Sequence, residues 1–211
     1  MTDKCFEIFD DEITKLHIAL QYHAPISHGI KGELSMDDLY EILHHCDSME
    51  SCRIVEDTIK EIWKANEDRK IRKRLDDGIS ELFRGDSQGA LLIFLDIVKD
   101  DPTYAEAWNK LSTCQFLLDD MQSSLDSANK TLELIPNHFQ ALNGLGLIQY
   151  ETRRYKLAAE SFRRSLHLNP WSPVSTKLSA CIDLQSELDL EEETWSQDGE
   201  QGAEEGTAPY H

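Results

Sequence analysis

Apolar residues recur every three or four positions along most of this chain, the spacing that places them on one face of an α-helix. The first such stretch lies at 5–23, and a stretch containing Pro25, Gly29 and Gly32 follows it. We therefore expect an amphipathic helix followed by a linker over residues 1–34. The apolar positions of this helix are Phe6, Phe9, Ile13, Leu16 and Leu20.

Three prolines divide the middle of the chain into equal units. Pro102, Pro136 and Pro170 are evenly spaced, and a short polar turn follows each of them. Proline ends a helix because it lacks an N–H and its ring clashes with the preceding turn. We therefore expect a helix to end near each proline. The units are 71–104, 105–138 and 139–172.

Residue size also repeats with this period. Small residues stand at unit positions 8 and 20, and a large residue stands at position 4 of the second unit and at position 24 of the first and third units. The residues that carry the pattern are Gly78, Ala90, Phe94, Pro102, Trp108, Pro136, Gly146, Ala158, Phe162 and Pro170. The pattern and its period resemble the tetratricopeptide repeat family. The resemblance implies an all-α fold, an α-solenoid of three helix-turn-helix units with helical caps at both ends.

Shorter stretches resemble a narrower group within that family. The segments AEAWNK (105–110) and NHFQALNGLGLI (137–148) are similar to uncharacterised short tetratricopeptide proteins of bacteria and of plants and algae. That group has no assigned reaction, so the resemblance implies an architecture and adds little on function.

Both ends of the repeat array have helical candidates for caps. Ser35 and Asp38 form a capping-box pattern, and a second apolar face follows, so we expect 35–70 to be a degenerate helical hairpin that caps the array. After the array, 173–186 predicts a solvating helix. Its apolar face comprises Val174, Leu178, Cys181 and Leu184.

The net charge of −19 changes the expectation for the C-terminus. Residues 187–211 are rich in Glu and Gly and contain no Lys or Arg. Such a segment buries too little apolar surface to offset its ordering entropy, so we expect a disordered acidic tail. Trp195 is either incidental there or the anchor of a short motif that binds a partner or the chain's own groove.

Two clusters suggest chemistry at first sight. His44, His45, Cys46 and Cys52 lie close together, but they lack the paired spacings of structural zinc sites, so we interpret them as a helix end with inward cysteines. The basic run RKIRKR at 69–74 is flanked by acidic residues on an acidic chain, so we interpret it as a solvated helix face and expect no nucleic-acid partner.

The remaining composition points to a non-enzymatic protein without metal or cofactor. The sequence contains no catalytic triad, phosphate loop or dinucleotide motif. Five cysteines without a CxxC pair suit a reducing compartment, and there is no apolar run long enough to span a membrane. We expect a cytoplasmic protein, or a stromal or matrix protein if the true N-terminus is longer.

Binding is the function that remains. The first helices of stacked repeats line a concave groove, and unit positions 2, 5, 6, 9 and 12 face it in this architecture. Asn109 and Asn143 recur at position 5 and could hold a peptide backbone, or they could simply tolerate a wet surface. The predicted groove residues are Arg72, Asn109, Lys110, Thr113, Phe116, Asn143, Leu147 and Tyr150.

One partner class can be compared with the sequence directly. Tetratricopeptide proteins that bind heat-shock chaperone C-termini resemble one another in a carboxylate clamp of Lys, Asn and Arg side chains. The corresponding positions here are Leu75, Ile79, Lys110, Gln140 and Gly144, which do not match it. We therefore expect an adaptor that binds another protein or peptide in its groove. The alternative is an assembly subunit that uses its N-terminal helix and convex face.

Overall fold

The computed structural model describes residues 35–46 and 48–204, with side chains as far as residue 190. The predicted N-terminal helix and linker, and the end of the acidic tail, lie outside the described residues. All regular structure in the described part is α-helical, which confirms the all-α prediction. The helices before the repeats are α2 (Met36–His45) and α3 (Met49–Lys64).

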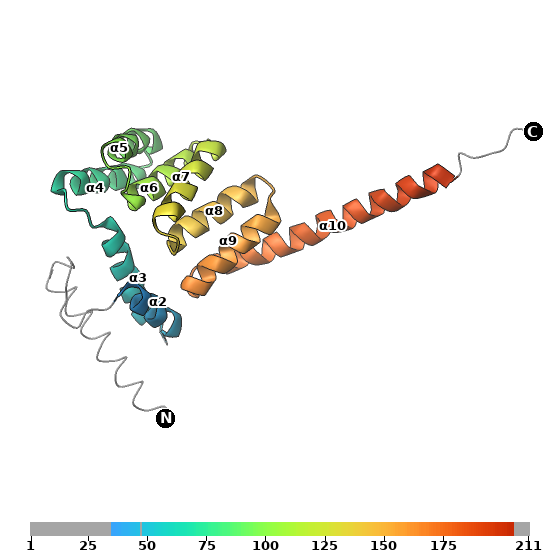
Figure 1. The fold of residues 1–211 in the computed structure, drawn as a ribbon, viewed down its shortest axis with the longest axis horizontal. Coiled ribbons are helices and arrows are strands. Elements are labelled where there is room, and N and C mark those ends of the chain that lie inside the picture. The colour runs from blue at the N-terminus through green and yellow to red at the C-terminus, as the bar shows by residue number, and fades with distance from the viewer. Residues whose placement is uncertain (1–34, 47, 205–211) are drawn as a thin grey trace, which may run out of the picture.

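The repeats form paired antiparallel helices stacked side by side (Figure 1). The first helix of each pair is α4 (Arg69–Phe83), α6 (Ala105–Leu117) or α8 (Phe139–Glu151). The second is α5 (Ser87–Asp100), α7 (Met121–Leu134) or α9 (Tyr155–Leu168). The second helices start at the same interval that separates the prolines, and so do α6 and α8. The spacing of the prolines therefore reappears in the spacing of the helices.

Glycine and phenylalanine set the distance within two of the pairs. A Cβ atom on Gly78 would lie 2.7 Å from Cε1 of Phe94, and one on Gly146 would lie 2.5 Å from Cε1 of Phe162. Both phenylalanines are fully buried. In the second pair Ser112 and Ser124 replace the small residues, and their buried hydroxyls bond across the helices at 2.9 and 2.8 Å to backbone carbonyls.

The turn inside each pair has a residue in the left-handed backbone conformation at the same position. Gly85, Asp119 and Arg153 have φ of 84°, 63° and 59° and occupy the same position in successive repeats. The next residue caps the second helix in two of the pairs, where Asp86 and Asp120 accept a backbone N–H. The third pair has Arg154 there, without a side-chain cap. The third turn is therefore the least favourable of the three.

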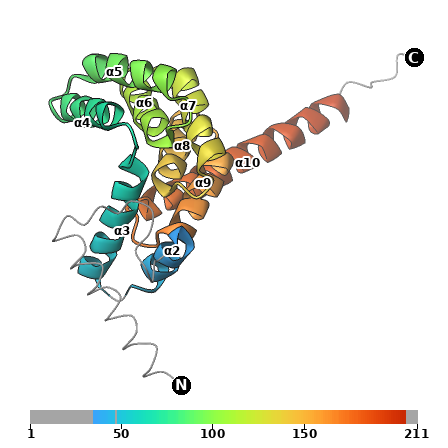
Figure 2. The same ribbon diagram turned by 60° about the vertical axis from the view of Figure 1, so that its left-hand side comes forward.

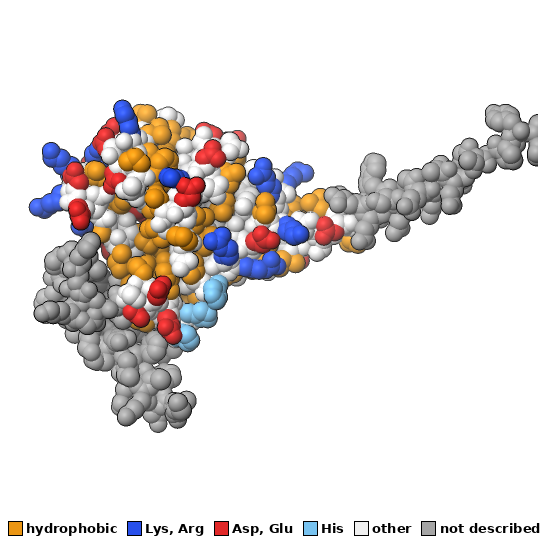
Figure 3. Space-filling view, viewed as in Figure 1, with side chains coloured by type: hydrophobic (Ala, Val, Ile, Leu, Met, Phe, Trp, Pro, Cys, Tyr) orange, Lys and Arg blue, Asp and Glu red, His pale blue; other side chains and the backbone are white. Residues whose placement is uncertain are grey.

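The hairpin of α2 and α3 does not stack on the first repeat. The sequence analysis placed it as a cap before α4, but its packing contacts are with α6, α9 and the loops that join the repeats. Figure 2 shows the hairpin lying along the edge where these loops gather, and Figure 3 shows apolar side chains over the junction of α3 and the array. Its core includes Leu39, Leu43, Val55, Ile59 and Phe139.

The connection after α3 explains this position. Ala65 leaves the helix in an extended conformation, and Asn66 Nδ2 donates to Asp101 Oδ2 at 2.9 Å in the loop before α6. The chain therefore crosses directly from the hairpin to the inter-repeat loop. A hairpin stacked on α4 would need a tight turn instead.

The final helix is longer than the sequence analysis predicted. α10 (Ser175–Glu204) continues through the segment expected to be a disordered tail and extends away from the array in Figures 1 and 2. Its first part packs on α9, with Val174 and Cys181 buried. Residues 187–204 contain no proline and are rich in Glu, Leu and Gln, and both features favour continuation of the helix.

Candidate functional site

The predicted groove residues lie on α4, α6 and α8, but they differ in accessibility. Arg72 and Thr113 are exposed, and Lys110 is partly exposed. Of the other five predicted groove residues, four are half-buried and one is buried. The half-buried residues are Phe116, Asn143, Leu147 and Tyr150.

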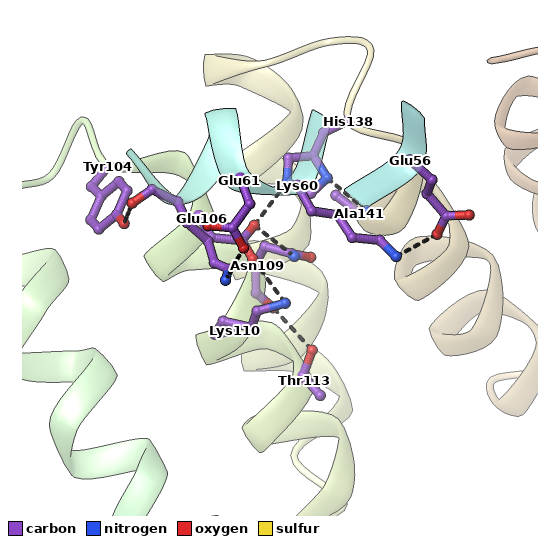
Figure 4. Close-up of polar contacts among 11 residues, drawn as sticks. Glu56, Lys60, Glu61, Tyr104, Glu106, Asn109, Lys110, Thr113, His138 and Ala141 are labelled. Carbon is purple, nitrogen blue, oxygen red and sulfur yellow. Dashed lines mark hydrogen bonds and ion pairs between the residues drawn. The ribbon is translucent and has the colours of Figure 1, made fainter. Parts of the chain in front are cut away.

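Asn109 is the buried one, with 7% of its surface exposed. Its Nδ2 donates to Glu106 Oε2 at 3.1 Å, so the expectation of a water-facing amide at this position is wrong. The reason is α3, which crosses the start of α6 and covers this end of the groove (Figure 4). Asn109 therefore contributes to the internal structure rather than to an open surface.

Glu106 is the centre of a buried polar cluster. Its carboxylate pairs with Lys110 Nζ at 2.8 Å and accepts a hydrogen bond from His138 Nε2 at 3.0 Å (Figure 4). Burial by itself raises the pKa of Glu106, but the Lys110 charge and the His138 hydrogen bond outweigh it and lower this pKa to about 2. Glu106 is thus an ionised carboxylate held inside the protein.

His138 links this cluster to helix α8. Its Nδ1 accepts the backbone N–H of Ala141 at 3.2 Å, so His138 is the N-cap of α8. An Nδ1 that accepts carries no proton, and the proton on the ring therefore sits on Nε2, facing Glu106. One fully buried imidazole caps a helix and binds a carboxylate on the neighbouring helix.

The hairpin closes over this imidazole. Trp63 stacks on His138 with the ring centroids 3.7 Å apart, and it also contacts Phe139. Two tyrosines bond across the same junction: Tyr40 donates to the Asn137 carbonyl at 2.7 Å, and Tyr104 donates to the Lys64 carbonyl at 2.6 Å. The sequence analysis missed these residues because no repeat column marks them.

The other end of the groove is covered by α10. Tyr150 lies under the Lys177 ammonium, 4.4 Å from its ring centroid, and packs with Leu147 against the cluster that contains Val174 and Cys181. Asn143 Nδ2 donates to Ser172 Oγ at 3.0 Å. The groove therefore stays accessible where neither α3 nor α10 covers it, at Arg72 on α4 and at Thr113 on α6.

Residues of the two clusters that suggested chemistry make structural contacts in the described part of the chain. Among the described residues, no three His, Cys, Asp or Glu side chains are placed to hold a metal ion together. The His44 ring packs edge-on against His167, with centroids 5.9 Å apart. In the basic run, Arg74 joins α4 to α5 through ion pairs with Asp96 and Asp100. In the same described part, no helix combines the length and apolarity needed to cross a membrane.

Comparison with known sequences supports the repeat architecture. Residues 128–173 match the family described as tetratricopeptide repeat. An 82-residue segment is 32% identical to a tetratricopeptide repeat-containing protein of Rhizobium etli, covering 38% of this chain and 40% of that protein. Another segment, of 85 residues, is 29% identical to the BBSome complex member BBS4 homolog of Drosophila melanogaster. It covers 40% of this chain and 18% of that protein. The matches thus span less than half of these relatives.

Solved structures share the fold. The first tetratricopeptide domain of Spaghetti (RPAP3), bound to the HSP90 peptide SRMEEVD, has a TM-score of 0.54 and 15% identity, covering 56% of this chain and 94% of that one. The MamA protein has a TM-score of 0.53 and 16% identity, covering 83% of this chain and all of that one. With the regular spacing of its helices, these matches show that α4–α9 form a solenoid similar to tetratricopeptide repeats.

Proposed function

We propose that this chain is a non-enzymatic adaptor that binds a peptide or protein segment in the concave groove of its repeats. The binding surface is the part of the groove that neither α3 nor α10 covers. The observation that carries the proposal is that Arg72 on α4 and Thr113 on α6 are exposed on the groove positions of adjacent first helices. Lys110 lies beside them with part of its side chain accessible.

The charges of this stretch favour a partner with acidic or hydrogen-bonding groups. Arg72 has a rigid fork of donors. The Thr113 hydroxyl donates to the Asn109 carbonyl at 3.1 Å, and its oxygen can still accept a hydrogen bond. Phe116 and Leu147 are half-buried and offer apolar surface nearby. Because Asn109 is enclosed and Asn143 is bonded to Ser172, neither asparagine is a contact residue in this proposal.

Affinity purification with mass spectrometry tests the groove. A groove variant with Arg72→Glu and Thr113→Arg is compared with a control variant, Lys99→Glu and Asn129→Arg, on the second helices α5 and α7. All four side chains are exposed, so both variants should fold. Proteins recovered by the wild type and the control, but lost by the groove variant, support the proposal. Equal recovery by all three contradicts it.

The alternative function is an assembly subunit, and one observation favours it. Because the hairpin packs elsewhere, the first repeat has exposed apolar side chains, with Phe83 88% and Leu92 61% exposed. Exposed apolar groups gathered on one repeat are typical of an interaction surface. Partner proteins that the Leu92→Asp variant no longer recovers, but that the groove variant still recovers, would favour this second function.

A further inference from the structure

A cleft lies between the hairpin and the edge of the array, separate from the concave groove. It has a volume of about 530 Å³, within the range of pockets that enclose a small ligand or a few side chains. Met36 and Tyr40 of α2 and Ile62 and Trp63 of α3 form one wall. Tyr104 and Ile135, from the loop before α6 and the end of α7, are part of the other.

The walls of this cleft are mostly apolar. Met36, Ile62 and Ile135 line it, and the Trp63 side chain beside them is 5% exposed. The nearby polar groups are already bonded within the protein, since the Tyr40 hydroxyl donates to the Asn137 carbonyl and pairs with the Trp63 side chain. The cleft is therefore suited to an occupant with apolar side chains, such as an apolar stretch of polypeptide.

The chain itself supplies such a stretch close by. Residues 5–23 have apolar side chains at helical spacing, and only the stretch 24–35 separates them from Met36, which lines the cleft. A linker of this length reaches up to roughly 40 Å when extended. A short flexible tether also gives an effective concentration of about millimolar, which favours an internal partner over an external one.

We propose that the apolar stripe of residues 5–23 docks into the cleft between the hairpin and the inter-repeat loops of the same molecule. Two or three side chains of the stripe enter the cleft. The docked segment adds apolar contacts from α2 and α3 to the loops before α6 and α8. It thereby fastens the hairpin across the edge of the array.

Hydrogen exchange of the full-length chain, measured by mass spectrometry, tests this docking. The stripe variant carries Phe9→Asp and Leu16→Asp. The control carries Thr14→Asp and Gln21→Asp, which add the same charge on the other side of the predicted helix. We expect amides of 5–23, and those at 36–43 and 134–138, to exchange about tenfold faster or more in the stripe variant, and as in the wild type in the control.

A second variant alters the cleft instead of the segment. Met36→Asp places a charge on the cleft wall and should release residues 5–23 by the same measure. Amides within α8 and α9 should keep their wild-type exchange in every variant, which shows that the repeats remain folded. Wild-type exchange at 5–23 in both the stripe variant and Met36→Asp would overturn the proposal. Protection of 5–23 that grows with protein concentration would also overturn it, because the occupant would then be a second copy.

Discussion

The indole of Trp63 stacks on the imidazole of His138, with the ring planes 16° apart and the centroids 3.7 Å apart. These residues are distant in the chain and belong to different substructures, since Trp63 lies in the hairpin and His138 caps the first helix of the third repeat. The contact joins the hairpin to the buried pair of His138 and Glu106. It therefore couples the position of the hairpin to the electrostatics of the repeat interior.

Removing the indole should detach the hairpin. Trp63→Ala deletes a side chain that is almost fully buried, and large-to-small changes of this kind cost about 3–5 kcal/mol. Urea unfolding followed by circular dichroism measures the change in the free energy of unfolding. Trp63→Phe keeps an aromatic ring over His138 and serves as the milder control. A loss of less than about 1 kcal/mol in Trp63→Ala would contradict the assigned role.

Glu106 should give the protein an acid-sensitive component of stability. The pKa of Glu106 is about 2 in the folded protein, against 4.5 for an ordinary glutamate, because Lys110 and His138 outweigh the effect of burial. A group whose pKa is lower in the folded protein than in the unfolded chain stabilises the fold at pH values above the unfolded-state pKa. For Glu106 this stabilisation is lost as the pH falls from about 4.5 towards 2.

The comparison variant for that pH dependence is Glu106→Gln. At pH 7 it should be less stable than the wild type, since it leaves Lys110 without its carboxylate partner. The gap in the free energy of unfolding should narrow by up to about 3 kcal/mol as the pH falls through this window. Denaturant titrations between pH 7 and pH 2.5 measure it, and a constant gap would contradict the ionised state of Glu106.

Two glycines of α8 provide a matched test of the repeat packing. A Cβ on Gly146 would collide with the Phe162 ring, whereas one on Gly144 would meet no atom within 4 Å. Both changes to alanine raise helix propensity equally. We expect Gly146→Ala to lower the free energy of unfolding by about 1–3 kcal/mol, and Gly144→Ala to raise it by up to about 1 kcal/mol. Thermal melts of the two variants decide the matter, and identical shifts would disprove the close contact.

Substitutions at Arg153 and Gly85, which both have positive φ, should have opposite effects on stability. Arg153→Gly relieves an unfavourable φ in the third repeat and should raise stability by about 0.5–1 kcal/mol. Gly85→Ala introduces the same conflict into the first repeat and should lower stability by about 1–2 kcal/mol. Melting temperatures measure both effects. A destabilised Arg153→Gly would show that the arginine side chain matters more than its backbone.

The groove should not bind the chaperone peptide SRMEEVD, which a structural neighbour holds. At the clamp positions Leu75 is fully buried, Ile79 is apolar and Lys110 is paired with Glu106. Fluorescence anisotropy with the labelled peptide should show no saturable binding. The protein concentration in this titration reaches 100-fold the Kd that a clamp-containing control domain has for the peptide. Binding that Lys110→Ala abolishes would reverse this expectation.

The local architecture was readable from the sequence because it depends on short-range physics. Pro102, Pro136 and Pro170 mark where second helices end, and Gly146 with Phe162 marks where two helices meet. Each of these features depends on the backbone limits of one residue or on the fit of two neighbouring helices. A periodic pattern therefore predicted the fold class and the helix pairs.

The accessibility of the groove could not be read in this way. Asn109 occupies a groove position by its repeat register, and only the arrival of α3 buries it. Little in the sequence indicates that α3 packs against α6. Trp63 and His138 lie in different units, and neither residue type recurs at its unit position. The groove was therefore predicted at its full length, whereas α3 and α10 cover parts of it in the folded chain.

By itself, the sequence determined that this chain forms helices, that they pair at the interval of the prolines and that the pairs stack into a solenoid, because these outcomes follow from apolar spacing, proline and side-chain size. Only the tertiary structure decided where the hairpin lies and how much of the groove stays open. That choice depends on the summed burial of Trp63, Phe139 and their neighbours and on the hydrogen bond of Asn66 to Asp101, across distances that no local pattern records.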